Sequence, residues 1–197
     1  MKVVTLLSGG LDSSLLACLL SEEMHEQFPL FINYGQINFK KEWEACVNTC
    51  NQLHLRQPEL LDLGGYGKSI HSGLTNENLD IINDVFLPNR NALLLITASA
   101  YALQNGCTHV AIGFLNEANH IFPDQTRAFL NKMEELLYVS LAKRIYIMSP
   151  LISLDKIDII NLAKKKGLAN TYSCHLGTEK PCGRCIACLE FLNSKNI

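Results

Sequence analysis

The chain has 197 residues, 48% of them hydrophobic, and carries a formal net charge of −2. This length and composition are enough for one core-forming domain with room for a small appendage. The slightly acidic charge balance excludes a protein that holds nucleic acid by bulk positive charge, and no apolar run is long enough to span a bilayer. The chain begins with a short strand pattern and not with a signal peptide, so the expected compartment is the cytoplasm.

Apolar, β-rich runs alternate with helical patterns along the chain. Predicted strands cover residues 3–7, 29–33, 59–63, 109–114 and 144–148, and predicted helices cover residues 11–23, 38–54, 91–105, 125–142 and 155–166. This alternation indicates an α/β, Rossmann-like domain at residues 1–170, with a parallel five-stranded sheet and helices on both faces. Ligands of such sheets bind beyond the carboxyl ends of the strands. Residues 64–90, rich in glycine and asparagine, are predicted to form a lid over that site.

Residues 8–14, with the sequence SGGLDSS, lie at the first strand-to-helix turn. They allow a plain helix start, in which glycines make the turn and a serine or Asp12 caps the first helical amides. They also allow a phosphate site, because residues without Cβ let backbone amides approach an anion at a helix N-terminus. A carboxylate beside phosphates repels them unless a cation lies between, so Asp12 favours a Mg²⁺ ion bound with the phosphates. The candidate phosphate-binding residues are Ser8, Gly9, Gly10, Leu11, Asp12, Ser13 and Ser14.

The SGGLDSS string resembles the signature of the PP-loop ATP pyrophosphatases, enzymes that split ATP between the α and β phosphates. It lacks the lysine and the longer glycine spacing of a Walker A loop. The resemblance implies a fold of the adenine nucleotide hydrolase type, ATP as a ligand, and adenylation of a carboxylate, carbonyl or amide oxygen. The string alone does not choose among members such as NAD synthetase, GMP synthetase and tRNA-modifying enzymes.

Half of the eight cysteines lie near the end of the chain, with the spacing Cys-x7-Cys-x2-Cys-x2-Cys. These four are Cys174, Cys182, Cys185 and Cys188. In a cytosolic chain such clustering indicates a metal site and not disulfides. Zinc is the favoured ion, and four thiolates leave it no open position, so residues 171–197 are predicted to be a structural zinc knot. An iron–sulfur cluster takes the same ligands, and His175 is an alternative ligand beside Cys174.

The phosphate string and the cysteine tail together resemble the 7-cyano-7-deazaguanine synthase family of queuosine-type biosynthesis. Further matches to the family are NYGQ at 33–36, FLPNRN at 86–91, FPD at 122–124, and SPL at 149–151 followed by Lys156. The resemblance implies a ligase that adenylates 7-carboxy-7-deazaguanine, or something close, and passes the acyl group to ammonia as an amide. A second ATP-dependent round would convert the amide into the nitrile.

The matching stretches supply the other candidate site residues. Arg90 and Lys156 are expected to neutralise pyrophosphate, and with Asp12 they form the predicted catalytic set. Lys156 lies in a first helical turn, against the dipole preference, which favours an anionic partner such as ATP. Tyr34 is expected to contact the nucleotide. The candidate substrate-binding residues are Gln36, Asn91, Glu117 and Asp124, of which Asp124 matches the adjacent N–H donors of a guanine-like edge.

Residues 116–127 depart from the family pattern. The family reads approximately Asp-x-Ser-Gly-Tyr-Pro-Asp-Cys-Arg where this chain reads ANHIFPDQT. The first acid, the Ser-Gly pair, the cysteine and, in ungapped register, the arginine are missing, whereas Asp124 is retained and Arg127 lies one position late. The basic residue usual three positions beyond the last cysteine is Phe191. The ATP half of the pattern is therefore intact, whereas the part that reads the acid is altered.

These departures leave several functions open. The leading hypothesis is an ATP-dependent carbon–nitrogen ligase that forms AMP and pyrophosphate from ATP, a deazaguanine-type acid and ammonia. A second hypothesis joins the adenylated acid to an amine of a protein partner in a conjugation or defence system. The acidic charge balance counts against a third, tRNA modification, and the intact string counts against a nucleotide-binding module without activity. A homodimer is a further candidate assembly.

Overall fold

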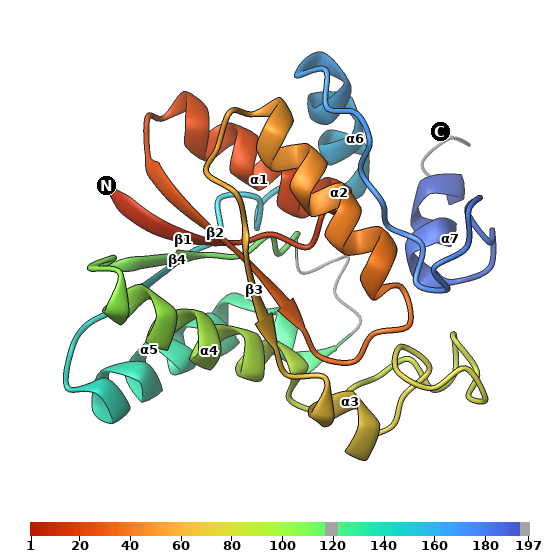
Figure 1. Cartoon of the computed structure of the whole chain (residues 1–197), viewed down its shortest axis with the longest axis horizontal. Coiled ribbons are helices and arrows are strands. Elements are labelled where there is room, and N and C mark those ends of the chain that lie inside the picture. The colour runs from red at the N-terminus through yellow and green to blue at the C-terminus, as the bar shows by residue number, and fades with distance from the viewer. Residues whose placement is uncertain (117–121, 194–197) are drawn as a thin grey trace.

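A computed structural model describes residues 1–116 and 122–193 of the chain (Figure 1). The strands are β1 (Lys2–Leu6), β2 (Glu26–Asn33), β3 (Glu59–Asp62), β4 (His109–Ala111) and β5 (Tyr146–Met148). The α-helices are α1 (Leu11–Glu22), α2 (Phe39–Gln52), α3 (Gly65–Ser69), α4 (Arg90–Gln104), α5 (Arg127–Leu141), α6 (Lys156–Lys165) and α7 (Ile186–Asn193). A 3₁₀ turn, η2 (Pro123–Gln125), precedes α5.

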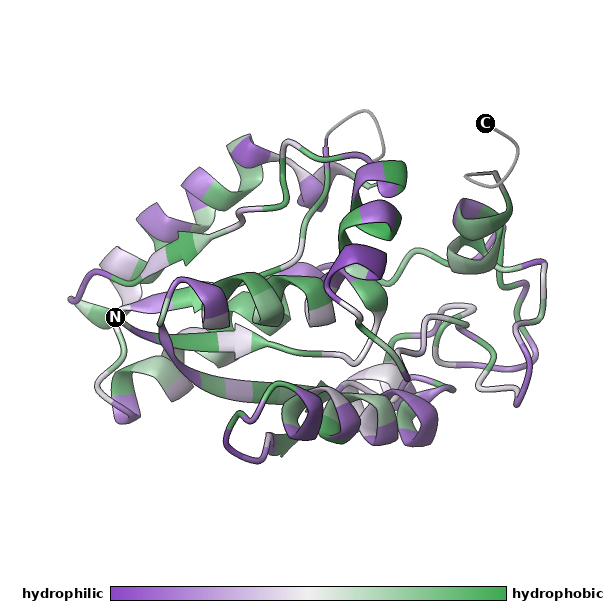
Figure 2. Ribbon diagram, turned by 90° about the horizontal axis from the view of Figure 1, so that it is seen from above, coloured by the Kyte–Doolittle hydropathy of each residue, from purple (hydrophilic) through white to green (hydrophobic). Residues whose placement is uncertain are grey.

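The strands form one parallel sheet of five in the order β3-β2-β1-β4-β5. Alternate residues of the central strand bury against opposite layers: Val4 and Leu6 pack with α4 and α5, and Val3 packs with α1 and α6. Helix α2 lies on the same side as α1 (Figure 1). In Figure 2 the helices beside the sheet carry alternating green and purple bands, as expected for helices with one buried side. The predicted α/β sheet with helices on both faces is confirmed.

Two short helices lie where the sequence predicts none. The sequence of α3 is GYGKS, and its two glycines give little helical propensity. Helix α7 begins directly after Cys185, includes Cys188, and has only eight residues. No helix within the described part of the chain is both long enough and apolar enough to cross a membrane.

The segment 70–88 packs against the cysteine tail. Leu74, Ile81 and Val85 form a small core with the buried tail residues Cys174 and Cys185. In both ribbon views this segment and α7 lie at the same end of the molecule (Figures 1 and 2). Part of the predicted lid therefore belongs to a second small core, and the lid role itself stays a prediction. The division of the chain at residue 170 stays a prediction.

Candidate functional site

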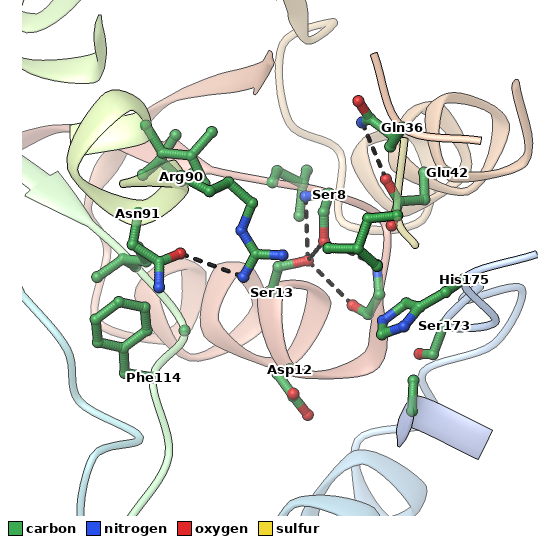
Figure 3. Close-up of a pocket in the computed structure, with 18 of the residues that line it drawn as sticks. Ser8, Asp12, Ser13, Gln36, Glu42, Arg90, Asn91, Phe114, Ser173 and His175 are labelled. Atoms are coloured by element: carbon green, nitrogen blue, oxygen red, sulfur yellow. Dashed lines mark hydrogen bonds between the residues drawn. The ribbon is translucent and has the colours of Figure 1, made fainter. Parts of the chain in front are cut away.

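A cavity of about 310 Å³ lies at the carboxyl ends of the strands (Figure 3). Its floor includes Leu6 and Leu7 at the end of β1, Ile32 in β2, and Gly113 and Phe114 just after β4. The strand order reverses between β1 and β4, which is where ligands bind in open α/β sheets. The volume is within the range of small-molecule sites. The predicted position of the site therefore coincides with this cavity.

Most of the SGGLDSS string lines the cavity, namely Ser8, Gly10, Leu11, Asp12 and Ser13. Ser14 instead turns towards α2, where its hydroxyl lies 3.0 Å from Thr49 Oγ1. The N-cap of α1 is Gly10, and no side chain makes a capping hydrogen bond there. The plain helix-cap interpretation of the string therefore does not describe this turn.

Hydroxyl oxygens accept the amide hydrogens of the turn. Ser8 N donates to Ser13 Oγ at 3.2 Å, and Gly10 N donates to Ser8 Oγ at 3.3 Å (Figure 3). Leu11 N donates across to Ser173 Oγ of the tail at 3.4 Å. Hydroxyl groups rotate and can both donate and accept. The turn therefore offers amides and hydroxyls that phosphate oxygens can take over.

The two glycines of the string have different surroundings. Gly9 has a φ of +77°, and a Cβ added there would lie 2.5 Å from Cys46 N and 2.6 Å from Glu42 O. Gly10 has a φ of −70°, and an added Cβ would meet its nearest atom, Ser8 Oγ, at 3.4 Å. Gly9 thus lets α2 approach the turn, and Gly10 leaves the cavity side open.

We expect Gly9→Ala to lower the free energy of unfolding by about 2 kcal/mol or more, because left-handed backbone and a backbone clash coincide. Gly10→Ala serves as the matched control and should cost less than about 1 kcal/mol, since its added methyl makes ordinary contacts. Urea unfolding of both variants measures the difference. Equal losses would contradict the close approach of α2 at Gly9.

Lys156 links the string to the tail. Its Nζ lies 2.9 and 3.0 Å from the two carboxylate oxygens of Asp12, and 3.1 Å from Glu190 Oε2 on α7. Burial lowers the pKa of Lys156, but the attraction of the two carboxylates outweighs it and raises the pKa above its usual value. The sequence predicts that Asp12 binds Mg²⁺ and that Lys156 binds ATP. In the structure these two side chains contact each other. Glu190 was not among the predicted residues.

Arg90 and Asn91 begin α4 and both line the cavity (Figure 3). The guanidinium of Arg90 lies 5.8 Å from the centre of the Tyr34 ring, and its Nη2 donates to Asn91 Oδ1 at 3.4 Å. Burial raises the pKa of Tyr34 to about 12 although Arg90 acts to lower it, so this phenol stays neutral. The structure thus brings three predicted residues together around one cation.

Asp124 lies beside the cavity in the 3₁₀ turn, between the lining residues Phe122 and Gln125. Its carbonyl oxygen accepts a hydrogen bond from Asn91 Nδ2 at 3.1 Å. Its carboxylate Oδ1 is buried and has no hydrogen-bond partner within the described ranges. A buried carboxylate oxygen without a donor calls for a ligand or water donor. Glu117, the other predicted acid, falls outside the described residues.

Gln36 is buried and holds a carboxylate that the sequence did not single out. Its Nε2 donates to Glu42 Oε2 at 3.2 Å (Figure 3), and Asn38 Nδ2 donates to Glu42 Oε1 at 3.0 Å. Burial raises the pKa of Glu42 to about 7, although both amide hydrogen bonds and the charge of Arg90 act to lower it. Glu42 lines the cavity.

His175 also lines the cavity, although the sequence suggested it only as an alternative metal ligand. Its Nδ1 is buried and has no hydrogen-bond partner in the part of the chain that the structure describes. Burial, followed by the charges of Arg90 and Lys156, lowers the pKa of His175 to about 4, so the ring is neutral. Glu42 and His175 belong to no nucleotide-binding motif, so the sequence pattern did not identify them as cavity residues.

The tail cysteines form a possible metal centre. The sulfur atoms of Cys174, Cys182, Cys185 and Cys188 all lie within 4.8 Å of one another. Cys182 Sγ and Cys188 Sγ are 3.9 Å apart, close to the ~3.8 Å edge of a tetrahedron with Zn–S bonds of ~2.3 Å. Burial raises the pKa of Cys174, but hydrogen bonds led by that from Cys182 N lower it to about 6. The cluster therefore fits a four-thiolate metal ion.

Comparison with known proteins extends these observations. Residues 2–194 match the family described as "Queuosine biosynthesis protein QueC". The 7-cyano-7-deazaguanine synthase of Methanobrevibacter smithii is 34% identical over 207 residues, covering 96% of this chain and 90% of that protein. The synthase of Campylobacter jejuni subsp. jejuni is 31% identical over 202 residues, covering 95% and 90%.

A solved structure with the same fold is the U34-tRNA thiolase NcsA from Methanococcus maripaludis with its [4Fe-4S] cluster. Its TM-score is 0.57 at 17% identity, and the match covers 100% of this chain and 65% of that one. At this identity the likeness concerns the fold alone.

Proposed function

The chain belongs to the QueC family of queuosine biosynthesis proteins, and we propose that it adenylates 7-carboxy-7-deazaguanine, or a close analogue, and passes the acyl group to nitrogen. The observation that carries this proposal is the convergence of the SGGLDSS string, Arg90 and Lys156 on one cavity at the carboxyl ends of the strands. Anion-binding amides and two cations suit the triphosphate of ATP. The curated relatives are named for the corresponding nitrile product.

In the proposed first step, a carboxylate oxygen of the acid attacks the α-phosphorus of ATP, and pyrophosphate leaves with the bonding electrons. The amides of the SGGLDSS turn bind the phosphates, and Arg90 offsets the charge that develops on pyrophosphate. Lys156 lies within reach of the same region and would exchange its contact with Asp12 for a phosphate oxygen. A Mg²⁺ ion held by Asp12 would neutralise the remaining charge between carboxylate and phosphates.

In the proposed second step, the nitrogen of ammonia attacks the acyl carbonyl, and AMP leaves with the electrons of the carbon–oxygen bond. The product is an amide. A second round of adenylation, now on the amide oxygen, would leave the nitrile after loss of AMP. This sequence uses one ATP for each round.

We assign zinc to the cysteine cluster, with a structural role. Four thiolates complete the tetrahedron and leave no position for substrate. The observation that favours a structural role is the packing of the cluster on segment 70–88. Metal analysis of the purified protein distinguishes zinc from an iron–sulfur cluster, because the latter contains iron and acid-labile sulfide.

A protein amine is the second candidate acceptor. It is favoured by the altered segment 116–127, in which several residues of the family pattern are missing although Asp124 is retained. Both acceptors follow the same adenylation step. Mass spectrometry of co-expressed proteins for a deazaguanine-sized adduct would detect the second.

The test of the proposed function is acid-dependent exchange of labelled pyrophosphate into ATP. We expect exchange with 7-carboxy-7-deazaguanine and, in a separate reaction, with its amide. Benzoate and guanine, which supply the carboxylate and the base separately, are the controls and should give none. Absence of exchange with both deazaguanine compounds would contradict the proposal.

We expect Asp124→Asn to weaken binding of the deazaguanine acid about ten- to a hundredfold while sparing ATP. The reason is that a carboxylate accepts two adjacent N–H donors of a guanine edge, and loss of such a charge-assisted pair costs roughly 1.5–3 kcal/mol. Calorimetry with the acid and with ATP measures both affinities on the same variant. Unchanged affinity for the acid would mean that Asp124 does not bind the deazaguanine acid.

A further inference from the structure

One cavity wall carries an acid that the proposed ATP chemistry does not use. Glu42 lies in the first turn of α2, and both of its carboxylate oxygens accept hydrogen bonds from amides, one from Gln36 and one from Asn38. No salt bridge to Glu42 occurs within the described ranges. Its orientation is therefore fixed by neutral amide groups and not by an ion pair within these ranges.

The same wall joins α2 to the cysteine tail. Asn38 Nδ2 donates both to Glu42 Oε1 and to the carbonyl oxygen of Cys174, each at 3.0 Å. The next residue is His175, which also borders the cavity and whose Nδ1 has no hydrogen-bond partner among the described residues. In Figure 3, Glu42 and His175 enter from the side opposite Asn91 and Phe114. This wall thus offers acceptor atoms, whereas Arg90 and Lys156 offer only donors.

The charged and titratable groups around Glu42 come from three elements. Arg90 at the start of α4 favours the ionised form of Glu42, Tyr34 lies in the turn directly after β2, and Cys46 is on the same helix as Glu42. Burial opposes ionisation more than Arg90 favours it, and the pKa of Glu42 is raised to about 7. A carboxylate with such a pKa can accept and release protons near neutral pH.

We propose that the nitrogen nucleophile binds at this wall and that Glu42 takes its proton. This inference rests on the proposed function and adds a residue to its second step. As the nitrogen lone pair forms the carbon–nitrogen bond, the bond to AMP breaks and its electrons leave with AMP. One N–H proton passes to a Glu42 oxygen and then to solvent. The nucleophile is a small amine, with ammonia as the simplest case.

Glu42→Gln tests the assignment, with Glu44→Gln as the matched control because Glu44 is an exposed acid on the same helix. Pyrophosphate exchange reports the adenylation step, and amide formation from preformed adenylate reports the second. We expect Glu42→Gln to keep exchange within about threefold of wild type. Its amide formation should fall at least about 100-fold, the usual contribution of a general base. Glu44→Gln should change neither rate.

The pH dependence provides a second readout. The base is active when ionised, so the wild-type rate of amide formation, expressed per free ammonia, should fall as the pH drops through the pKa of Glu42, near 7. Glu42→Asp keeps a carboxylate and should retain an inflection, whereas Glu42→Gln should lose it. Equal loss of both half-reactions would overturn the assignment and indicate that Glu42 contacts the nucleotide. An unchanged inflection in Glu42→Gln would also overturn it, because another group would then set the pH dependence. No exchange in wild type would instead overturn the proposed function.

Discussion

Replacement of Asp12 by asparagine is expected to abolish acid-dependent pyrophosphate release, with a loss of at least about 100-fold, while the chain stays folded. The carboxylate lines the cavity at the N-terminus of α1, where Mg²⁺ and the phosphates of ATP are proposed to bind. An amide cannot replace its charge. We expect a stability cost of only about 1–3 kcal/mol for two reasons. Gly10 and not Asp12 is the N-cap of α1, and Lys156 retains its ion pair with Glu190 in the variant.

Glu22→Gln is the matched control for Asp12→Asn. Glu22 lies at the other end of α1 and pairs with Lys166, just beyond α6, at 2.6 Å, outside the cavity lining. The control breaks a solvent-exposed ion pair between the same two regions of the chain. It should lower the free energy of unfolding by less than about 1 kcal/mol and leave activity unchanged. Steady-state pyrophosphate release and thermal unfolding measure both effects. Retained pyrophosphate release in Asp12→Asn would contradict the proposed role of the string.

Cys185→Ser is expected to lower the free energy of unfolding by several kcal/mol, because structural metal sites contribute their binding energy to folding. Cys185 is fully buried in the core shared by the tail and segment 70–88. The tail also supplies Ser173, His175 and Glu190 to the cavity wall. Loss of metal should therefore weaken ATP binding as well as stability.

Cys107→Ser is the control for Cys185→Ser, since Cys107 is equally a buried thiol but belongs to the sheet core. It should cost about 1–3 kcal/mol and leave the metal content unchanged. Chelation of wild type should reproduce the loss seen in Cys185→Ser. Purified protein without tightly bound zinc, or with normal stability after chelation, would contradict the structural zinc assignment.

The sequence was sufficient for the sheet but not for every helix. Most strands contain a short apolar run, and the alternation of these runs with helical patterns predicts parallel pairing. Helix α3 could not be anticipated because its glycines oppose helix formation. It is fixed by tertiary contact instead: a Cβ on Gly67 would lie 2.5 Å from Tyr34 O, so only glycine permits this approach.

The residues of the candidate site that belong to a sequence motif could be predicted from the sequence. The SGGLDSS string and Arg90 stand at the ends of elements and were expected near the ligand, whereas the pairing of Asp12 with Lys156 joins residues 144 positions apart. Glu42, His175 and Glu190 belong to no motif, and only the packing of α2 and the tail brings them to the cavity. Their side chains look like ordinary helix or loop residues in the sequence.

In the proposed reaction, ATP activates the acid by forming an acyl adenylate. The most direct measurement uses 7-carboxy-7-deazaguanine labelled with ¹⁸O in its carboxylate, with ATP and ammonium, and analyses AMP, pyrophosphate and phosphate by mass spectrometry. An acyl adenylate leaves one carboxylate oxygen on phosphorus when the acyl group moves to nitrogen. We therefore expect a single ¹⁸O atom in AMP during the first round. Label in inorganic phosphate together with ADP, and none in AMP, would contradict it.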